Sequence, residues 1–543
     1  MRRILFLLFL AVLPTAGSTA REKPRLVLVI CVDQLPYHFL TRFSGHFGER
    51  GFRLLTEDGA VFANAHYTHA FTLTGPGHAV ISTGSTPAQH GIVGNNWFNR
   101  ETGKIVYSAE DPAVKILGMQ SPGRSPANLR LTTIGDALRM STGFRSRVVS
   151  ISHKDRSAIF MGGKMPNAAY WLLDSSFVSS SYYMKVLPPW VNEFNRSGLA
   201  MSFRDSVWTR LLPEEAYAEM DRDDAPYEAD VSGLGRTFPH SLGGVEHGKY
   251  LDALWHTPFL NDLMLAFVKQ AIMADSLGRG PATDMLFVGL SVNDAVGHAF
   301  GPESHEVLDM TVRTDRLLAD LFGFLDQWVG LDNMVLVLTS DHGIAPIPEY
   351  VLSKYPSADV GRIGSGAMKT LCESFLDNGF GKPGKKVSWI DRIVDGSIYI
   401  NRKAVAARKQ TLDRVIVALA DSLRHSSMIG AVLTGPEAVS GRDVGEIEQR
   451  LRRSFFAPRS GDLVVALRPH YLDHGGTTGT DHGQPYDYDT HVPVIIRGEG
   501  VVAGFYYESA SPADIAPTLS VLLEIDFPAA PEGRVLTEAL KDR

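Results

Sequence analysis

Short apolar runs recur along the chain without the polar alternation that marks a half-exposed strand. They lie at residues 26–32, 148–151, 285–291, 334–340, 463–467 and 492–496. Strands that are apolar on both sides are typical of a parallel sheet with helices on both faces. Between two of these runs, leucine and valine recur at roughly helical spacing, at Leu308, Val312, Leu318, Leu321 and Leu325. The pattern predicts an α/β fold with a mostly parallel central sheet flanked by helices.

Two stretches interrupt this alternation, at roughly 160–280 and 345–460. Both are rich in glycine, proline, serine and charged residues, and neither keeps the strand and helix rhythm of the remaining chain. We expect them to be insertions that form a cap over the sheet. With 543 residues, the chain is long enough for a large core and more than one structural unit.

The first twenty residues have the pattern of a secretory signal peptide. Arg2 and Arg3 precede an apolar run that ends at Leu13, and the small residues of 18–20 follow at a cleavage position. This run is about half the length of roughly 20 apolar residues that a membrane span needs. We therefore expect export to the periplasm or the medium, by the general or the twin-arginine route, and no stable membrane span after cleavage.

Net charge and cysteine content limit the classes of molecule that the protein is expected to bind. The formal net charge is −7, so the sequence has no basic footprint for nucleic acid as a specific partner. Cys31 and Cys372 lie far apart, and they give no disulfide framework. We expect small molecules as partners, and the oligomeric state is not determined by these patterns.

Three acidic residues follow apolar runs, which places them at the carboxyl ends of predicted strands. Asp33 follows the run at 26–32, Asp294 the run at 285–291, and Asp341 the run at 334–340. This edge is where open α/β sheets bind ligands. A lone aspartate there is more often a cap or turn former, but His298 stands four residues after Asp294 and His342 directly follows Asp341. Carboxylate and imidazole side chains in this arrangement suit zinc.

A third motif of the same kind is Thr480-Asp481-His482-Gly483. Upstream, Thr74 begins the segment Thr74-Gly75-Pro76-Gly77, and Gly84 offers a helix end. Thr74 would then lie at a helix N-terminus, where free backbone N–H groups favour an anion. We interpret Thr74 as a nucleophile, with helix capping as its simpler role and Thr72 as a competing candidate.

These motifs resemble the alkaline phosphatase superfamily, and most of all its secreted, phosphate-irrepressible bacterial branch with a threonine nucleophile. The resemblance covers residues 26–534, and it implies an alkaline phosphatase-like catalytic domain at 21–543. It implies two Zn²⁺ ions, one bound by Asp33, Asp341, His342 and Thr74, and the other by Asp294, His298 and His482. The residues that match phosphate-oxygen binders are Asn95, with Asn96 as the alternative, and Lys154 and Arg156.

The charge balance of the predicted site indicates a role for Lys154 and Arg156 independently of the family resemblance. Two zinc ions bring about +4, and three carboxylates with an ionised Thr74 bring about −4, so the metal cluster is near neutral. The two cations then add about +2, which balances a dianionic monoester better than a monoanionic diester. We expect in-line attack by Thr74, a phosphothreonine intermediate, and release of inorganic phosphate. Asn95, Lys154, Arg156 and the backbone near Gly75 would hold the nonbridging oxygens.

Other functions fit part of the pattern. A phosphodiesterase or nucleotide pyrophosphatase would share both zinc sites and Thr74, but it would use an apolar pocket in place of Lys154 and Arg156. A sulfatase needs an oxidisable Cys or Ser followed by Pro and Arg, and Thr74 and His78 stand at those positions. The leader sequence argues against a cytosolic phosphoglycerate mutase. A non-catalytic zinc-binding surface protein is the alternative from another class.

Overall fold

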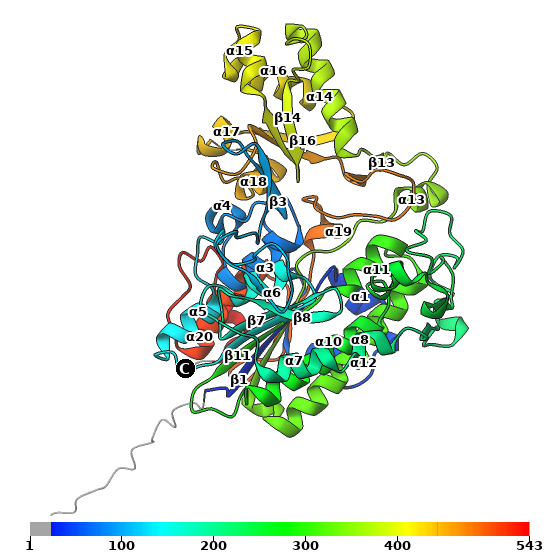
Figure 1. Cartoon of the computed structure of the whole chain (residues 1–543), viewed down its shortest axis with the longest axis vertical. Helices are drawn as coiled ribbons and strands as arrows, with labels where there is room; N and C mark the ends of the chain where they lie inside the picture. Colours follow the sequence, from blue (N-terminus) through cyan, green and yellow to red (C-terminus); the bar gives the residue numbers. More distant parts are fainter. Residues whose placement is uncertain (1–22, 443, 542–543) are drawn as a thin grey trace, which may run out of the picture.

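The computed structural model describes residues 23–442 and 444–541, and the predicted signal peptide at 1–20 lies outside them. A ten-stranded sheet crosses the body of the molecule (Figure 1). Its strands, in spatial order, are β20 (Gly504–Tyr506), β2 (Ala60–Phe62), β19 (Val494–Gly498), β12 (Met334–Thr339), β1 (Leu26–Val32), β11 (Asp284–Leu290), β6 (Val148–Ser152), β7 (Ala168–Leu173), β8 (Ser176–Ser180) and β5 (Ile116–Leu117). The five strands from β12 to β7 run parallel.

Strand β1 lies at the centre, and every one of its residues is fully buried. Its side chains alternate between two cores. Leu28 and Ile30 join the core on one face, and Val27 and Val29 join the core on the other. This two-sided burial explains the uninterrupted apolar run in the sequence, and it confirms the predicted α/β fold class.

Helices cover both faces of the sheet (Figure 1). The Leu28 face packs against α1 (Tyr37–Arg42), α2 (Phe52–Asp58), α7 (Pro189–Arg196), α9 (Tyr250–Leu254), α10 (Phe259–Ala274), α11 (Val292–Phe300) and α12 (His305–Trp328). The opposite face packs against α3 (Thr74–Thr83), α5 (Ile134–Ser141), α6 (Asp155–Gly162) and α20 (Ile515–Leu523). Helix α12 contains the leucine and valine repeat that predicted a helix at this place.

A separate lobe stands above the sheet, at the top of Figure 1. Its four antiparallel strands, in spatial order, are β14 (Ile390–Val394), β15 (Ser397–Ile400), β17 (Leu463–Leu467) and β16 (Ile429–Thr434). Its helices are α14 (Ser365–Phe380), α15 (Arg402–Ala407), α16 (Leu412–Arg424), α17 (Gly435–Val439) and α18 (Glu446–Arg453). We call residues 365–467 the cap. Trp389 and Leu419 are fully buried in a hydrophobic core that the cap forms for itself.

Two segments differ from the sequence expectation. The run at 463–467 forms β17, which pairs within the cap and not within the central sheet. An apolar run predicts burial but does not identify the core that buries it. Residues 168–180, inside the stretch expected to be an insertion, form β7 and β8 of the central sheet. Among the described residues, no helix combines the length and apolar character that crossing a membrane requires.

Candidate metal centre

Four adjacent strands deliver polar side chains to one edge of the sheet. In spatial order these strands are β12, β1, β11 and β6. Asp341 lies just beyond β12, Asp33 directly follows β1, Asp294 lies in the first turn of α11 after β11, and Lys154 precedes α6 after β6. Because parallel strands end at the same edge, residues far apart in sequence meet there.

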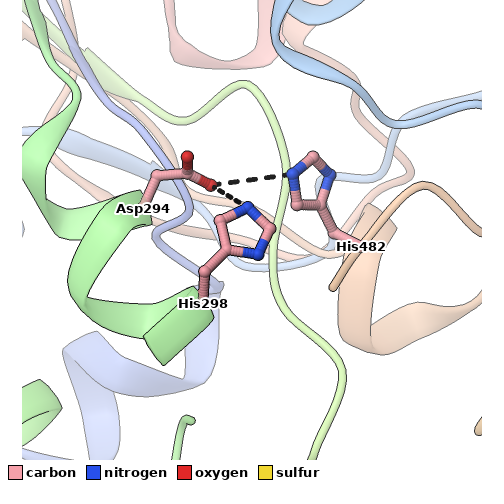
Figure 2. A group of neighbouring side chains, drawn as sticks. All are labelled: Asp294, His298 and His482. Atoms are coloured by element: carbon pink, nitrogen blue, oxygen red, sulfur yellow. Dashed lines mark ion pairs between the residues drawn. The ribbon is translucent and has the colours of Figure 1, made fainter. Parts of the chain in front are cut away.

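Asp294, His298 and His482 form one group, in which the potential ligand atoms lie within 4.8 Å of one another. Asp294 and His298 are four residues apart on α11, so their side chains share one helix face. His482 comes from the segment before α19 (Asp487–Thr490). Figure 2 shows both imidazole rings directed at the Asp294 carboxylate. Oδ1 of Asp294 lies 3.1 Å from Nε2 of His298 and 3.6 Å from Nε2 of His482.

Asp33, Asp341 and His342 form a second group with the same 4.8 Å limit, and all three are buried. Nε2 of His342 lies 3.3 Å from Oδ1 of Asp33 and 3.4 Å from Oδ2 of Asp341. His78 closes the group from α3, because its Nδ1 lies 3.3 Å from Oδ2 of Asp341. The six side chains that were predicted to bind zinc are therefore gathered in two groups, as the resemblance implies.

The same kind of hydrogen bond orients His298, His342 and His482. Each Nδ1 lies within hydrogen-bond distance of a backbone carbonyl, which fixes the ring and leaves Nε2 for the carboxylates. The carbonyls are those of Thr480 for His298 (2.8 Å), Gly343 for His342 (3.0 Å) and Thr72 for His482 (2.7 Å). A histidine that donates Nδ1–H to the backbone while Nε2 faces other ligands is typical of a metal site.

Buried atoms without a hydrogen-bond partner support the same interpretation. Among the described residues, Oδ1 of Asp33, Oδ2 of Asp341 and Nε2 of His342 are such atoms. Burying polar atoms without a partner is costly, and native proteins rarely do so without a reason. Nitrogen and carboxylate oxygen donors that converge in this way fit a divalent ion such as zinc.

The protonation states of the histidines differ across the centre. Burial by itself lowers the pKa of His298, but the adjacent Asp294 carboxylate outweighs it and raises that pKa to about 10. Burial, together with the neighbouring His342 and His298, lowers the pKa of His482 to about 3. Around Asp294 one imidazole is therefore cationic and one is neutral. Because metal ligation needs neutral imidazole, a bound ion would take the place of the His298 proton.

Thr74 is the first residue of α3, as predicted, and its side chain is buried. The helix ends at Thr83, and Gly84 follows it with a φ of 70°, in the left-handed region. Nζ of Lys154 and Nη2 of Arg156 each lie 3.4 Å from the Thr74 hydroxyl oxygen. The proposed nucleophile therefore lies between two cations. The competing Thr72 donates its hydroxyl to the Gln484 carbonyl instead.

Lys154 links the two carboxylate groups. Its Nζ lies 2.7 Å from Oδ2 of Asp33 and 2.6 Å from Oδ2 of Asp294. Burial alone would lower the pKa of Lys154, but these two carboxylates raise it above its ordinary value. The ammonium therefore stays charged at the point where both groups and Thr74 meet.

Arg156 is held by residues that the sequence motifs did not single out. Tyr107, at the end of β4 (Lys104–Tyr107), donates a short hydrogen bond to Asp155 and accepts one of 3.4 Å from Arg156. Arg124 binds the other oxygen of Asp155 at 2.7 Å. Burial opposes the charge of Arg156, but Tyr107 and Asp155 outweigh it and raise the Arg156 pKa. The network fixes the direction of the guanidinium towards Thr74.

Asn95 lies against the start of α3, where its Oδ1 accepts the backbone N–H of Gly75 at 2.8 Å. The expectation that backbone near Gly75 holds phosphate oxygens was therefore wrong for this N–H group, because the Asn95 side chain already occupies it. The same bond orients Asn95 so that its Nδ2 group remains as a donor. Asn96, the alternative, begins β3 (Asn96–Asn99).

Gln34 is a site residue that sequence reasoning missed. Its Nε2 donates to Oδ1 of Asp294 at 2.6 Å, and its backbone N–H donates to Oδ1 of Asp341 at 3.2 Å. It is buried with a φ of 62°. A Cβ at Gly297 would collide with the Gln34 side chain, so the glycine makes room for it. The only sequence signal is its place directly after Asp33, which does not distinguish it from an ordinary turn residue.

Known proteins match the chain over nearly its full length. Residues 27–489 match the model of the type I phosphodiesterase / nucleotide pyrophosphatase family. Alkaline phosphatase PhoV of Synechococcus elongatus is 37% identical over 535 residues, covering 97% of this chain and 95% of that protein. Alkaline phosphatase PafA of Elizabethkingia meningoseptica is 34% identical over 530 residues, covering 96% of each.

The crystal structure of wild-type PafA superposes on this chain with a TM-score of 0.90 at 35% identity, covering 96% of this chain and 100% of that one. Similarity in sequence and in fold thus extends together over the sheet, the metal centre and the cap. The chain belongs to the type I phosphodiesterase / nucleotide pyrophosphatase family, within the alkaline phosphatase superfamily.

Proposed function

We propose that this protein is an alkaline phosphatase, a zinc-dependent phosphomonoesterase that releases inorganic phosphate from phosphate monoesters. The observation that carries the proposal is the position of Lys154 and Arg156, each 3.4 Å from the Thr74 hydroxyl oxygen. The relatives PhoV and PafA, which are named alkaline phosphatases, support it over the whole chain.

The charge of the site favours a doubly charged substrate. With two divalent ions, three carboxylates and an ionised threonine, the metal centre is near neutral, at about zero. Lys154 and Arg156 then leave about two positive charges beside Thr74, which matches the dianion of a monoester. A diester carries one negative charge, which would leave about one of the two positive charges of the site unbalanced.

Each of the two ligand groups would hold one zinc ion. Asp33, Asp341 and His342 would bind one ion together with Thr74, and Asp294, His298 and His482 would bind the other. When bound, the two ions supply positive charge next to the attacking oxygen and next to the oxygen of the departing alcohol.

The residues of the chain have separate tasks in the reaction. Thr74 loses its hydroxyl proton to solvent and attacks phosphorus, so that a threonine–phosphate bond forms while the bond to the alcohol oxygen breaks and that oxygen takes up a proton from solvent. A water oxygen then attacks phosphorus, the threonine–phosphate bond breaks, Thr74 regains its proton, and phosphate is released. Arg156, Lys154 and Nδ2 of Asn95 bind the nonbridging oxygens, where charge must be stabilised during phosphoryl transfer.

Phosphodiester hydrolysis is the second candidate, because the chain belongs to the type I phosphodiesterase / nucleotide pyrophosphatase family. The two activities share Thr74 and the metal ligands, so those residues do not distinguish them. Lys154 and Arg156 do distinguish them, since we expect a diester enzyme to have an apolar pocket for its second ester group in place of these two cations.

The export signal completes the proposal. With residues 1–20 removed as a signal peptide, the enzyme acts in the periplasm or outside the cell. The catalytic domain then spans 21–543, with the cap at 365–467 as the insertion that shapes access to the site.

Substitution of the two neighbouring threonines tests the proposed nucleophile. Thr74→Ala should retain bound zinc but lower the turnover of p-nitrophenyl phosphate by roughly a thousandfold or more. Thr72→Val is the matched control, because it removes a hydroxyl two residues away and keeps the carbonyl that orients His482. It should keep turnover within a few-fold of the wild type. Rates in Thr74→Ala that equal those of the wild type would end the assignment.

A further inference from the structure

A β-hairpin turn of the cap lies next to Asn95. Strands β14 and β15 are joined by Asp395 and Gly396, whose φ angles of 45° and 72° are both in the left-handed region. Such a two-residue turn matches the twist of paired strands. A Cβ at Gly396 would collide with the ring of Phe71, which precedes the nucleophile segment. The turn is therefore packed directly against the catalytic body.

The Asp395 carboxylate binds the segment that carries Asn95. Its Oδ2 accepts the backbone N–H of Asn96 at 3.1 Å. A Cβ at Gly94 would lie 2.5 Å from the same Oδ2 atom, so a glycine is needed for this approach. The carboxylate thus holds the backbone directly after Asn95 from the side of the cap.

The Asn95 side chain connects this backbone segment to the helix that carries Thr74. Its side-chain oxygen accepts the N–H of Gly75 at 2.8 Å, and Gly75 directly follows Thr74 in α3. A continuous series of hydrogen bonds therefore runs from the cap to the residue next to Thr74. Nδ2 of Asn95 can bind phosphate only if the side chain is held in this direction. Asp395 holds the backbone directly after Asn95, and the position of this backbone determines the direction of the Nδ2 group.

Resting on the proposed phosphomonoesterase function, we propose that Asp395 of the cap is a positioning residue for phosphate binding, which acts through Asn95. The cap would then do more than cover the site, because it would supply one of the groups that align the phosphate-binding amide. Asp395 itself does not need to touch the substrate.

The ionisation of Asp395 agrees with this role. Burial raises the pKa of its carboxyl to about 6, with a further rise from Asp481, while the nearby backbone N–H groups and Arg156 oppose the rise. At alkaline pH the carboxylate is therefore ionised. An ionised carboxylate accepts the Asn96 N–H group, and hydrogen bonds to a charged acceptor are stronger than neutral ones.

A double-mutant cycle with Asn95 tests the proposal. Asp395→Gly removes the carboxylate but keeps the left-handed backbone that the turn requires, and Asp395→Asn keeps a carbonyl acceptor. We expect Asp395→Gly to lower kcat/KM for p-nitrophenyl phosphate roughly 10- to 100-fold and to weaken inhibition by inorganic phosphate. Asp395→Asn should recover most of this loss. In an Asn95→Ala background, Asp395→Gly should change kcat/KM by less than about threefold.

The controls separate positioning from folding and from the wider function. Asp391→Asn, in the same cap strand, should leave kcat/KM unchanged, and zinc content and Tm should not change in step with the kinetic loss. The proposal is overturned if the losses from Asp395→Gly and Asn95→Ala multiply in the double variant, or if Asp395→Asn is as impaired as Asp395→Gly. The wild-type rate on the monoester reports separately on the proposed function, since it does not depend on the cycle.

Discussion

Gln34 allows the two ligand groups of the metal centre to be tested separately. Its side chain hydrogen-bonds Asp294 of one group, while its backbone N–H hydrogen-bonds Asp341 of the other. In Gln34→Met the chain length and volume are nearly kept, but the Nε2 donor to Asp294 is lost. The backbone N–H to Asp341 remains. The φ of 62° costs methionine as much as glutamine, so the backbone conformation adds no difference in the free energy of unfolding.

The size of the effect follows from the bond that is removed. A hydrogen bond to an ionised carboxylate is worth about 1.5–3 kcal/mol, and each 1.4 kcal/mol is about tenfold in affinity. At 2.6 Å and in a buried setting, this bond orients the oxygen that faces His298 and His482. We expect zinc to bind roughly 10- to 100-fold more weakly at the Asp294 group, and with nearly unchanged affinity at the Asp33 group.

Competition with a chromophoric chelator measures both zinc affinities on the metal-free enzyme. The wild type, Gln34→Met and the exposed control Gln89→Met are titrated side by side, and only Gln34→Met should show one weakened site. The reasoning fails if both affinities in Gln34→Met stay within threefold of the wild type. It also fails if both sites weaken equally, since the backbone bond to Asp341 is intact.

Further predictions concern selectivity, pH and the contact of the cap. Lys154→Ala should lower kcat/KM for a monoester at least about 100-fold and kcat/KM for a diester less than about tenfold. Equal losses on the two substrates would favour phosphodiester hydrolysis as the function. Glu228 is 2% exposed, and burial, with Glu306 and Asp223, raises its pKa to about 10. Its contribution to stability is therefore fully present below pH ~4.5 and is lost as the pH rises towards 10, at up to about 1.4 kcal/mol per pH unit. The Tm advantage of Glu228→Gln over the wild type should grow between pH 5 and 9, and a constant difference would contradict it. Gly396→Ala should lower both Tm and monoester kcat/KM, because its Cβ meets the Phe71 ring and its φ is positive; a variant with both values unchanged would show that the turn is not packed as described.

The central sheet was predictable because its strands are buried on both faces. The run at 26–32 coincides with β1, and the runs that end beside Asp294 and Asp341 agree with β11 and β12 to within one residue at each end. A strand followed by an aspartate is a pattern that the local sequence shows. Because parallel strands end at the same edge of the sheet, the aspartates that follow them lie close together. The two groups around Asp33 and Asp294 could therefore be foreseen before any distance was known.

His482 was predictable in a different way. No strand leads to it, and its position depends on the Thr480 segment packing against α11, where the Thr480 backbone N–H bonds the His298 carbonyl at 2.9 Å. The sequence alone indicates only an Asp-His-Gly motif, and the resemblance supplied its role. The same holds for Asn95, whose orientation comes from the Gly75 bond.

The residues that sequence reasoning missed all act across long sequence separations. Tyr107 and Arg124 orient Arg156 from outside its motif, and Asp395 reaches Asn96 from the cap. The Asp-Gly pair at 395–396 is a hairpin signal that could have been recognised, but no local pattern states what a hairpin turn will touch. Likewise, the apolar run of β17 indicated a buried strand but not that the cap would bury it.

The most direct measurement compares hydrolysis of p-nitrophenyl phosphate and bis-p-nitrophenyl phosphate by the same enzyme, before chelation, after chelation and after zinc is restored. We expect the monoester to react far faster than the diester, both rates to vanish with the metal, and both to return when about two zinc ions per chain are bound. Faster diester hydrolysis, or monoester turnover that survives removal of the metal, would contradict a two-zinc phosphomonoesterase.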